Sequence, residues 1–291
     1  MAIKQILVPL TGESKAEHVC AMAFDIAGKS AAHVVGTDTI ADPGPFLDQS
    51  GVGMMAAYYD ELFKSAEKVL AQKRANASQA FESARSKFGA KLVEASGGQP
   101  ANGAGVTAKW ISGADHNGQT VSLFGRLSDL IIVCQPGPTA SFGEMQVFET
   151  AVFTARRPVL VVPNGAKSLG RRAAIAWNGS VEACGAVEGA LDLLAGLDGV
   201  DIIQVGDIKP GNATAQSLAV YLGWHGIAAK IKTVSDQGGS TAKIIIGEAK
   251  SAGASFLVMG AYTHSPLREL ILGGVTQHMI GYADIPVVMA H

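Results

Sequence analysis

The sequence predicts an α/β fold of two tandem doubly wound (Rossmann-like) domains, each a mostly parallel five-stranded sheet flanked by helices. Three observations lead to this prediction: the chain repeats itself, strand-like and helix-like stretches alternate, and several strand-like runs are continuously apolar. Examples are DLIIVC (129–134) and FLVM (256–259). Strands that are apolar on both faces are typical of a parallel sheet covered by helices on both sides.

The internal repeat indicates the domain organisation. Three pairs of segments match between the two halves: 3–27 with 171–195, 127–135 with 253–261, and 156–163 with 284–291. The segment PNGAKSLGRR (163–172) between the copies has the composition of a linker. We therefore predict two copies of one unit, residues 1–166 and residues 167–291.

Apolar periodicity places the elements of each unit. In the second unit we expect strands near 173–177, 200–205, 229–234, 256–259 and 286–289, and helices near 181–195, 213–223, 240–251 and 275–281. Right-handed strand–helix–strand crossovers then give an open sheet in each unit. The first unit carries a Gly- and Pro-rich insert at 41–62, which leads into a long helix over about 58–88. The insert fits either a lid or partner surface, or plain packing of the helix.

Composition excludes several functional classes. Apolar residues make up 48% of the 291 residues and charged residues 16%, which favours a large core over disorder. The net charge of -2 gives no electrostatic case for binding nucleic acid or an anionic membrane. No run approaches the ~18 apolar residues that a membrane helix needs, and the N-terminus does not resemble a signal peptide. Three cysteines without metal-ligand spacing suggest idle thiols. We expect a soluble, cytoplasmic protein.

The stretch MGAYTHSPLRELILGGVT (259–276) is the strongest candidate for a binding loop. In a doubly wound sheet, ligands bind beyond the carboxyl ends of the strands, and Asn178, Val205 and Gly260 are each expected at such an end. A glycine at position 260 would let the backbone approach a ligand closely, because it has no Cβ.

The end of the same stretch favours an anion. Gly273 and Gly274 precede the last expected helix, whose N-terminal N–H groups and dipole attract negative charge. Thr276 is a candidate for capping that helix or for offering its hydroxyl to a phosphate. The spacing alone fits ordinary turn chemistry equally well, and the stretch is neither a GxxxxGK[ST] loop nor a GxGxxG fingerprint.

These features together resemble the universal stress protein family in its tandem form. The resemblance rests on the two-fold repeat, on the openings ILVPLTGE and AIAWNGS, and on the ending VMGAYTHSPLRELILGGVTQHMIGYADIPVVMA. One branch of that family binds adenine nucleotides through the pattern Gly-x2-Gly-x9-Gly-(Ser/Thr). Here Gly260, Thr263, Gly273 and Gly274 occupy the four positions, so the spacing is kept while two residue types differ.

The resemblance implies a site for ATP or a related adenine nucleotide, with or without Mg²⁺, in the second unit. It places Asn178 near the ribose, where binders usually carry Asp, and Val205 as a backbone contact to adenine. The phosphate and ribose loop would comprise Met259, Gly260, Thr263, Gly273, Gly274, Val275 and Thr276. Thr263 is unfavourable if that position needs a positive φ angle, so the site resembles a weakened version of the family's.

The first unit departs further from the pattern. Our alignment places Gln135 opposite Gly260, and Met145 and Gln146 opposite the later glycine pair. Thr11 stands where binders carry an acidic residue. With a side chain at each point of close approach, the first unit is expected to act as scaffold.

No catalytic constellation is recognisable. His264 lies in the candidate loop, where it suits either a general acid/base role or a surface position. Metal-ligand spacing is absent among the histidines, so we expect no metal centre and at most slow ATP hydrolysis.

Two hypotheses of different classes follow. The first is a stress-response regulator that binds an adenine nucleotide in its second half. The alternative is a nucleotide-independent protein-interaction module with degenerate loops. A third hypothesis, with less support from the residues, is an adenylate-using transferase. The resemblance also implies that the last strands of the two units pair, which gives a pseudo-dimer within one chain, and that a homodimer of such chains is common.

Overall fold

The computed structural model describes residues 3–13, 16–40, 56–93, 105–112, 119–236, 238–261 and 274–291, with only the backbone at 56–60 and 62. Its strands are β1 (Gln5–Leu10), β2 (His33–Asp38), β3 (Lys91–Leu92), β4 (Thr107–Ile111), β5 (Leu130–Cys134), β6 (Val159–Val162), β7 (Arg172–Ala176), β8 (Gly199–Val205), β9 (Ala229–Val234), β10 (Phe256–Gly260) and β11 (Val287–Ala290). Its helices are α1 (Ala16–Ser30), α3 (Ala56–Lys87), α4 (Gln119–Gly125), α5 (Phe142–Glu149), the π-helix η1 (Thr150–Ala155), α6 (Val181–Leu194), α7 (Ala215–Trp224), α8 (Thr241–Ser251) and α9 (Gly274–Tyr282).

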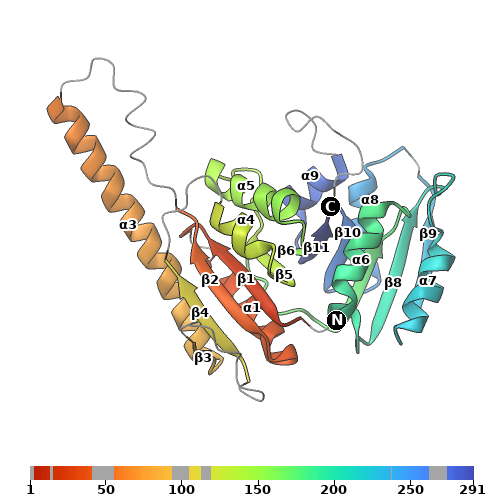
Figure 1. The fold of residues 1–291 in the computed structure, drawn as a ribbon. Helices are drawn as coiled ribbons and strands as arrows, with labels where there is room; N and C mark the ends of the chain where they lie inside the picture. Colours follow the sequence, from red (N-terminus) through yellow and green to blue (C-terminus); the bar gives the residue numbers. More distant parts are fainter. Residues whose placement is uncertain are drawn as a thin grey trace.

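Within the described residues, all strands belong to one eleven-stranded sheet (Figure 1). Its order is β3-β4-β2-β1-β5-β6-β11-β10-β7-β8-β9. We call residues 1–166, which supply β1 to β6, the N-terminal half, and residues 167–291, which supply β7 to β11, the C-terminal half. The predicted fold class, α/β with mostly parallel strands in two similar halves, is confirmed. The sequence did not predict the two-residue edge strand β3 or the π-helix.

The two halves meet at an antiparallel pair of strands. Leu160 of β6 lies opposite Val288 of β11, whereas every other strand pair in the described sheet is parallel. The expected pairing of the last strand of each unit is therefore confirmed. The pairing merges what were predicted as two five-stranded sheets into a single continuous one.

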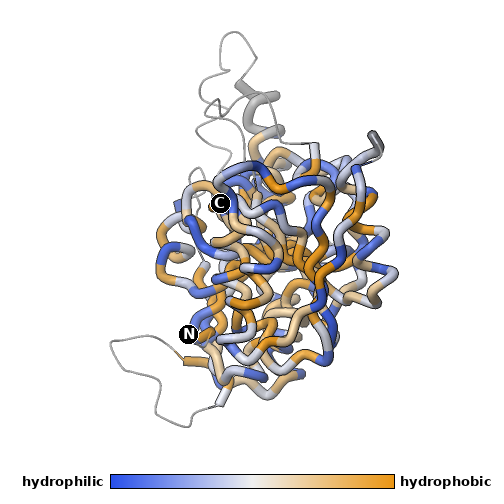
Figure 2. The backbone as a smooth tube through the Cα atoms, turned by 90° about the vertical axis from the view of Figure 1, so that its right-hand side faces the viewer, coloured by the Kyte–Doolittle hydropathy of each residue, from blue (hydrophilic) through white to orange (hydrophobic). Residues whose placement is uncertain are grey.

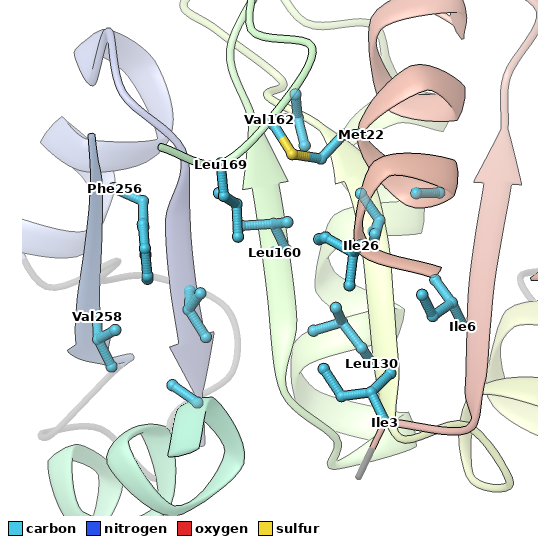
Figure 3. Close-up of a cluster of buried hydrophobic side chains, with 14 of the residues drawn as sticks. Ile3, Ile6, Met22, Ile26, Leu130, Leu160, Val162, Leu169, Phe256 and Val258 are labelled. Carbon is cyan, nitrogen blue, oxygen red and sulfur yellow. The ribbon is translucent and has the colours of Figure 1, made fainter. Parts of the chain in front are cut away.

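Helices cover both faces of the sheet and form two hydrophobic cores. The first core lies against α1, α3, α6 and α7, and the second against α4, α5, η1, α8 and α9. Figure 3 shows that the first core crosses the boundary between the halves, because Leu160 of β6 and Leu169 of the linker lie between Met22 of α1 and Phe256 of β10. In Figure 2, hydrophobic segments run through the middle of the molecule and hydrophilic ones gather toward the outside. Both halves thus contribute to each of the two cores.

The turn after the first strand of each half shows the repeat at atomic detail. Gly12 has φ +74° and Gly179 has φ +71°, a conformation that favours glycine. A Cβ at either position would lie 2.3 Å from a backbone oxygen, that of Lys73 or that of Ala213. Both turns therefore need glycine for the same two reasons.

His33 gives the fold a predictable dependence on pH. Its half-buried ring lies with Nδ1 2.8 Å from Thr107 Oγ1, and burial, together with the nearby Lys109, lowers the pKa of the imidazole. In the unfolded chain the ring titrates near pH ~6.5, so the unfolded state binds more protons as the pH falls. The contribution of His33 to stability is complete above that pH and is lost as the pH drops toward the lower folded pKa.

We predict that the urea midpoint of the wild type falls between about pH 7.5 and pH 5, and that His33→Gln reduces this fall. Gln keeps a hydrogen-bonding group near Thr107 but has no titration in this range, and the other titrating groups are common to both proteins. Identical pH profiles for the two proteins would contradict the assignment.

Candidate functional site

Three of the predicted site residues lie at one edge of the sheet. The strands β10, β7 and β8 are neighbours and parallel, so their carboxyl ends point the same way (Figure 1). Asn178 lies two residues beyond β7, Val205 is the last residue of β8, and Gly260 is the last residue of β10. The structure therefore brings these positions to the edge where doubly wound sheets bind ligands.

Asn178 has an exposed side chain that is already partly engaged. Its Oδ1 accepts a hydrogen bond from the N–H of Ser180 at 3.1 Å, and its backbone oxygen accepts one from Asn212 Nδ2 at 3.0 Å. Ser180 in turn caps α6, because its Oγ accepts from the N–H of Ala183 at 3.2 Å. The turn holds Asn178 in place, and its side-chain amide is available to donate to a ligand hydroxyl.

At Val205 the main chain, and not the side chain, faces the sheet edge where a ligand would bind. Val205 pairs with Val234 of β9, and its half-buried side chain packs on the second core. Gly206 then leaves the sheet with φ +69°, and its N–H donates to the Val234 oxygen at 2.8 Å. The polypeptide therefore turns directly after Val205, where a ligand at the sheet edge would meet main-chain groups.

Gly260 has a structural reason to be glycine. A Cβ at this position would lie 2.5 Å from the backbone nitrogen of Ala183 and 2.7 Å from the carbonyl carbon of Glu182, both in the first turn of α6. Met259, the preceding residue, is buried. The sequence suggested that another group approaches Gly260 closely, and in the structure the backbone of helix α6 does so.

The start of α9 is the second part of the predicted loop. Gly274 is exposed, with nothing within 4 Å of the position of a Cβ, and Val275 is half-buried. Thr276 is the third residue of α9 and is buried, so the prediction that it caps this helix is wrong, because the helix begins two residues earlier. Thr263 and Gly273 lie outside the described residues, as does His264.

A groove of about 440 Å³ lies between part of α9 and the N-terminal half. Gly137 and Pro138, which follow β5, form one side together with Met145 of α5. The other side includes Gly274 and His278 of α9. This groove was not predicted, because it depends on how the two halves pack.

The register of the N-terminal half corrects one predicted equivalence. Cys134 pairs with Val162 at the end of β6 as Gly260 pairs with Ala290 at the end of β11. Cys134, and not Gln135, therefore lies opposite Gly260. The match of 127–135 with 253–261 already gives this register, so the predicted equivalence of Gln135 with Gly260 was displaced by one residue. The position still carries a side chain in place of glycine.

Gln135 instead corresponds to Ala261, since their N–H groups donate to the last residues of β6 and β11 at 2.9 and 2.8 Å. Its side chain crosses to the other half: Nε2 donates to the backbone oxygens of Met279 at 3.2 Å and Ala283 at 2.8 Å. No feature of the sequence pointed to this contact.

Two further side chains that can carry chemistry, those of His291 and Cys20, make contacts within the fold. His291 Nδ1 lies 3.2 Å from the Ala261 oxygen, and its ring meets that of Phe153 edge-on with centroids 5.1 Å apart. Burial raises the pKa of the Cys20 thiol, which keeps it protonated. Among the described residues, no three His, Cys, Asp or Glu side chains are grouped so that they could hold a metal ion. None of the described helices is both long and apolar enough to cross a membrane.

Comparisons of this fold with solved structures agree with the two-half architecture. A universal stress protein from Archaeoglobus fulgidus is 20% identical, with 98% of this chain and 95% of that chain covered and a TM-score of 0.64. A putative universal stress protein from Pseudomonas aeruginosa UCBPP-PA14 is 12% identical, with 99% and 93% covered and a TM-score of 0.52. A functionally unknown protein from Pseudomonas aeruginosa PAO1 is 13% identical, with 99% and 92% covered and a TM-score of 0.51.

The fold and the strand-end site define a tandem doubly wound α/β protein with a candidate ligand edge in its C-terminal half. Residues 171–291 match the sequence model of the universal stress protein family. The C-terminal half therefore matches this family, and the N-terminal half repeats the same architecture. No curated protein matches the sequence.

We predict opposite effects for two glycine-to-alanine substitutions. Gly260→Ala forces a methyl group against the backbone of α6 and should destabilise the fold by about 1–3 kcal/mol. Gly274→Ala meets open space at the start of a helix and should be neutral or stabilise by up to about 1 kcal/mol.

Chemical denaturation of the two variants beside the wild type measures both effects. A Gly260→Ala protein as stable as the wild type would show that α6 does not impose glycine there, and a strongly destabilised Gly274→Ala would contradict the open surroundings of that residue.

Proposed function

We propose that the protein binds ATP or a related adenine nucleotide, with or without Mg²⁺, in its C-terminal half. The carboxyl ends of β7, β8 and β10 form the base of this site, and the start of α9 forms its phosphate end. The protein then acts as a ligand-responsive regulator of a stress response, in the cytoplasm. A homodimer of tandem chains remains part of this proposal.

The arrangement of Asn178, Val205 and Gly260 at one sheet edge is the observation that carries the proposal. An amide beside a main-chain turn suits a ribose hydroxyl next to a base that is read by backbone groups. The N-terminus of α9 begins at Gly274, whose lack of a side chain leaves its N–H accessible to a phosphate oxygen. These groups fit a nucleotide without requiring a metal ligand.

A regulator is a better account than a dedicated enzyme for the described residues. The residues at the strand ends are an amide, an apolar side chain and a glycine, and none of these is a general base or a nucleophile. Because the described strand ends supply no strong base to activate water, we expect any hydrolysis of ATP to be slow.

One observation favours the alternative, an interaction module that needs no nucleotide. Gly260 is explained by the packing of α6 alone, so its presence is not by itself a trace of ligand binding. On this alternative, residues 262–273 would be free of nucleotide, and a partner would bind the wild type and a Gly273→Val variant equally in a pull-down. On our proposal, Gly273→Val abolishes nucleotide binding.

Asn178→Asp tests the nucleotide site by strengthening it. The carboxylate keeps an acceptor for the Ser180 N–H, and its charge is favourable at the N-terminus of α6. The charge-assisted bond to a ribose hydroxyl should tighten ATP binding by about fivefold, measured by titration calorimetry.

The matched control is Thr11→Asp, the equivalent position in the N-terminal half, which should leave the affinity unchanged. If titration of the wild type with millimolar ATP and Mg²⁺ gives no binding heat, the proposal is wrong. Equal gains from the two substitutions would move the site out of the C-terminal half.

A further inference from the structure

Gln135 makes a polar contact from one half to a helix end of the other. Its Nε2 donates to Met279 and Ala283, whose carbonyls lie at the C-terminal end of α9. The last carbonyls of a helix have no partner within the helix. Met279 O already accepts from the N–H of Ala283 at 3.1 Å, so Gln135 adds a second bond there and supplies one to the Ala283 carbonyl. The N-terminal half thereby caps α9.

This contact is not repeated on the other side of the pseudo-two-fold. Ala261, the equivalent of Gln135, has only a methyl group, and its oxygen lies beside His291 Nδ1. The last helical segment of the N-terminal half, η1, meets the C-terminal half through the rings of Phe153 and His291. Among the residues that the structure describes, the side-chain hydrogen bonds to the end of a helix in the other half therefore run from the N-terminal half onto α9.

Helix α9 connects the two hydrogen bonds from Gln135 to the candidate nucleotide site. It has nine residues and is about 13 Å long, so a tilt at one end is carried to the other. Its C-terminal end is fixed by Gln135, and its N-terminal end is Gly274 at the phosphate end of the proposed site. The groove beside Gly137 and Pro138 leaves space next to the helix, so packing alone does not set its position on that side.

We propose that Gln135 is a positioning residue through which the N-terminal half sets the orientation of α9 and so the nucleotide affinity of the C-terminal half. This inference rests on the proposed nucleotide site. It gives the N-terminal half a regulatory role: a change at the end of β5, or in the segment beginning at Pro136, is transmitted to the phosphate end through one side-chain amide.

Two substitutions separate the hydrogen bonds from the packing of residue 135. Gln135→Met keeps the length and removes the donor, whereas Gln135→Lys keeps a donor, whose positive charge is favourable at a helix C-terminus. Gln72→Met is the control, because Gln72 is exposed on α3 and its Nε2 donates within that helix, to Asn76 Oδ1.

The first measurement is amide hydrogen exchange without nucleotide. Gln135→Met should raise exchange in α9 by about fivefold for each hydrogen bond lost, Gln135→Lys should restore it, and Gln72→Met should leave it unchanged. Unaltered exchange of α9 in Gln135→Met would show that the hydrogen bonds from Gln135 do not stabilise this helix. An equal rise of exchange throughout the sheet would show a general loss of stability instead.

The second measurement is the affinity of the same variants for ATP by calorimetry. Weaker binding by Gln135→Met, rescued in Gln135→Lys, is the expected result. Wild-type affinity in Gln135→Met, with faster exchange of α9, would overturn the positioning role while leaving the nucleotide site in place. If the wild type does not bind ATP, both proposals are wrong. The exchange data would then report only on the hydrogen bonds between Gln135 and α9.

Discussion

The antiparallel pairing of β6 with β11 is the interaction on which the rest of the structure depends. Each half alone would leave one of these strands as an unpaired apolar edge, which favours association with other chains. Pairing them within one chain makes a single sheet and lets one core extend from Met22 past Leu160 to Phe256. It also brings the end of β5 beneath α9. The contact between Gln135 and α9 exists only because the halves are joined in this register.

The two halves have kept the scaffold of the repeat and diverged at the strand ends. Gly12 and Gly179 occupy the same turn with the same conformation and the same lack of space. Cys134, by contrast, stands opposite Gly260, and Gln135 stands opposite Ala261. The turn is retained because the fold requires glycine in both halves, whereas at the strand ends the close approach of α6 requires glycine at Gly260 and the equivalent position is Cys134. On our account, one half keeps a ligand site and the other supports it.

Much of the fold could be predicted from the sequence because the apolar pattern reflects burial directly. Continuous apolar runs such as β5 and β10 are buried on both faces, and glycine turns mark where they end. The π-helix η1 could not be predicted, since it follows α5 directly and no Gly or Pro marks the change of helix type. The predicted equivalence of Gln135 with Gly260 was wrong by one residue, although the matched segments 127–135 and 253–261 give the same register as the strand ladders.

The candidate site shows a different limit. Sequence reasoning placed Asn178, Val205 and Gly260 correctly at the sheet edge, because strand ends follow from the apolar pattern. It could not show that Gly260 lies against α6, since a glycine required by a helix and one required by a ligand look the same. The roles assigned to Thr263 and Gly273 stay predictions. The contact of Gln135 and the neighbouring groove arise from packing between halves, which no local pattern encodes.

The number of adenine nucleotides bound per chain tests the central claim most directly, namely that one half binds and the other supports it. Native mass spectrometry of the full-length chain with excess ATP counts them without assuming an affinity. Our account predicts a single bound nucleotide per chain at saturation. Two per chain would contradict the division of roles between the halves, and none would contradict the site itself.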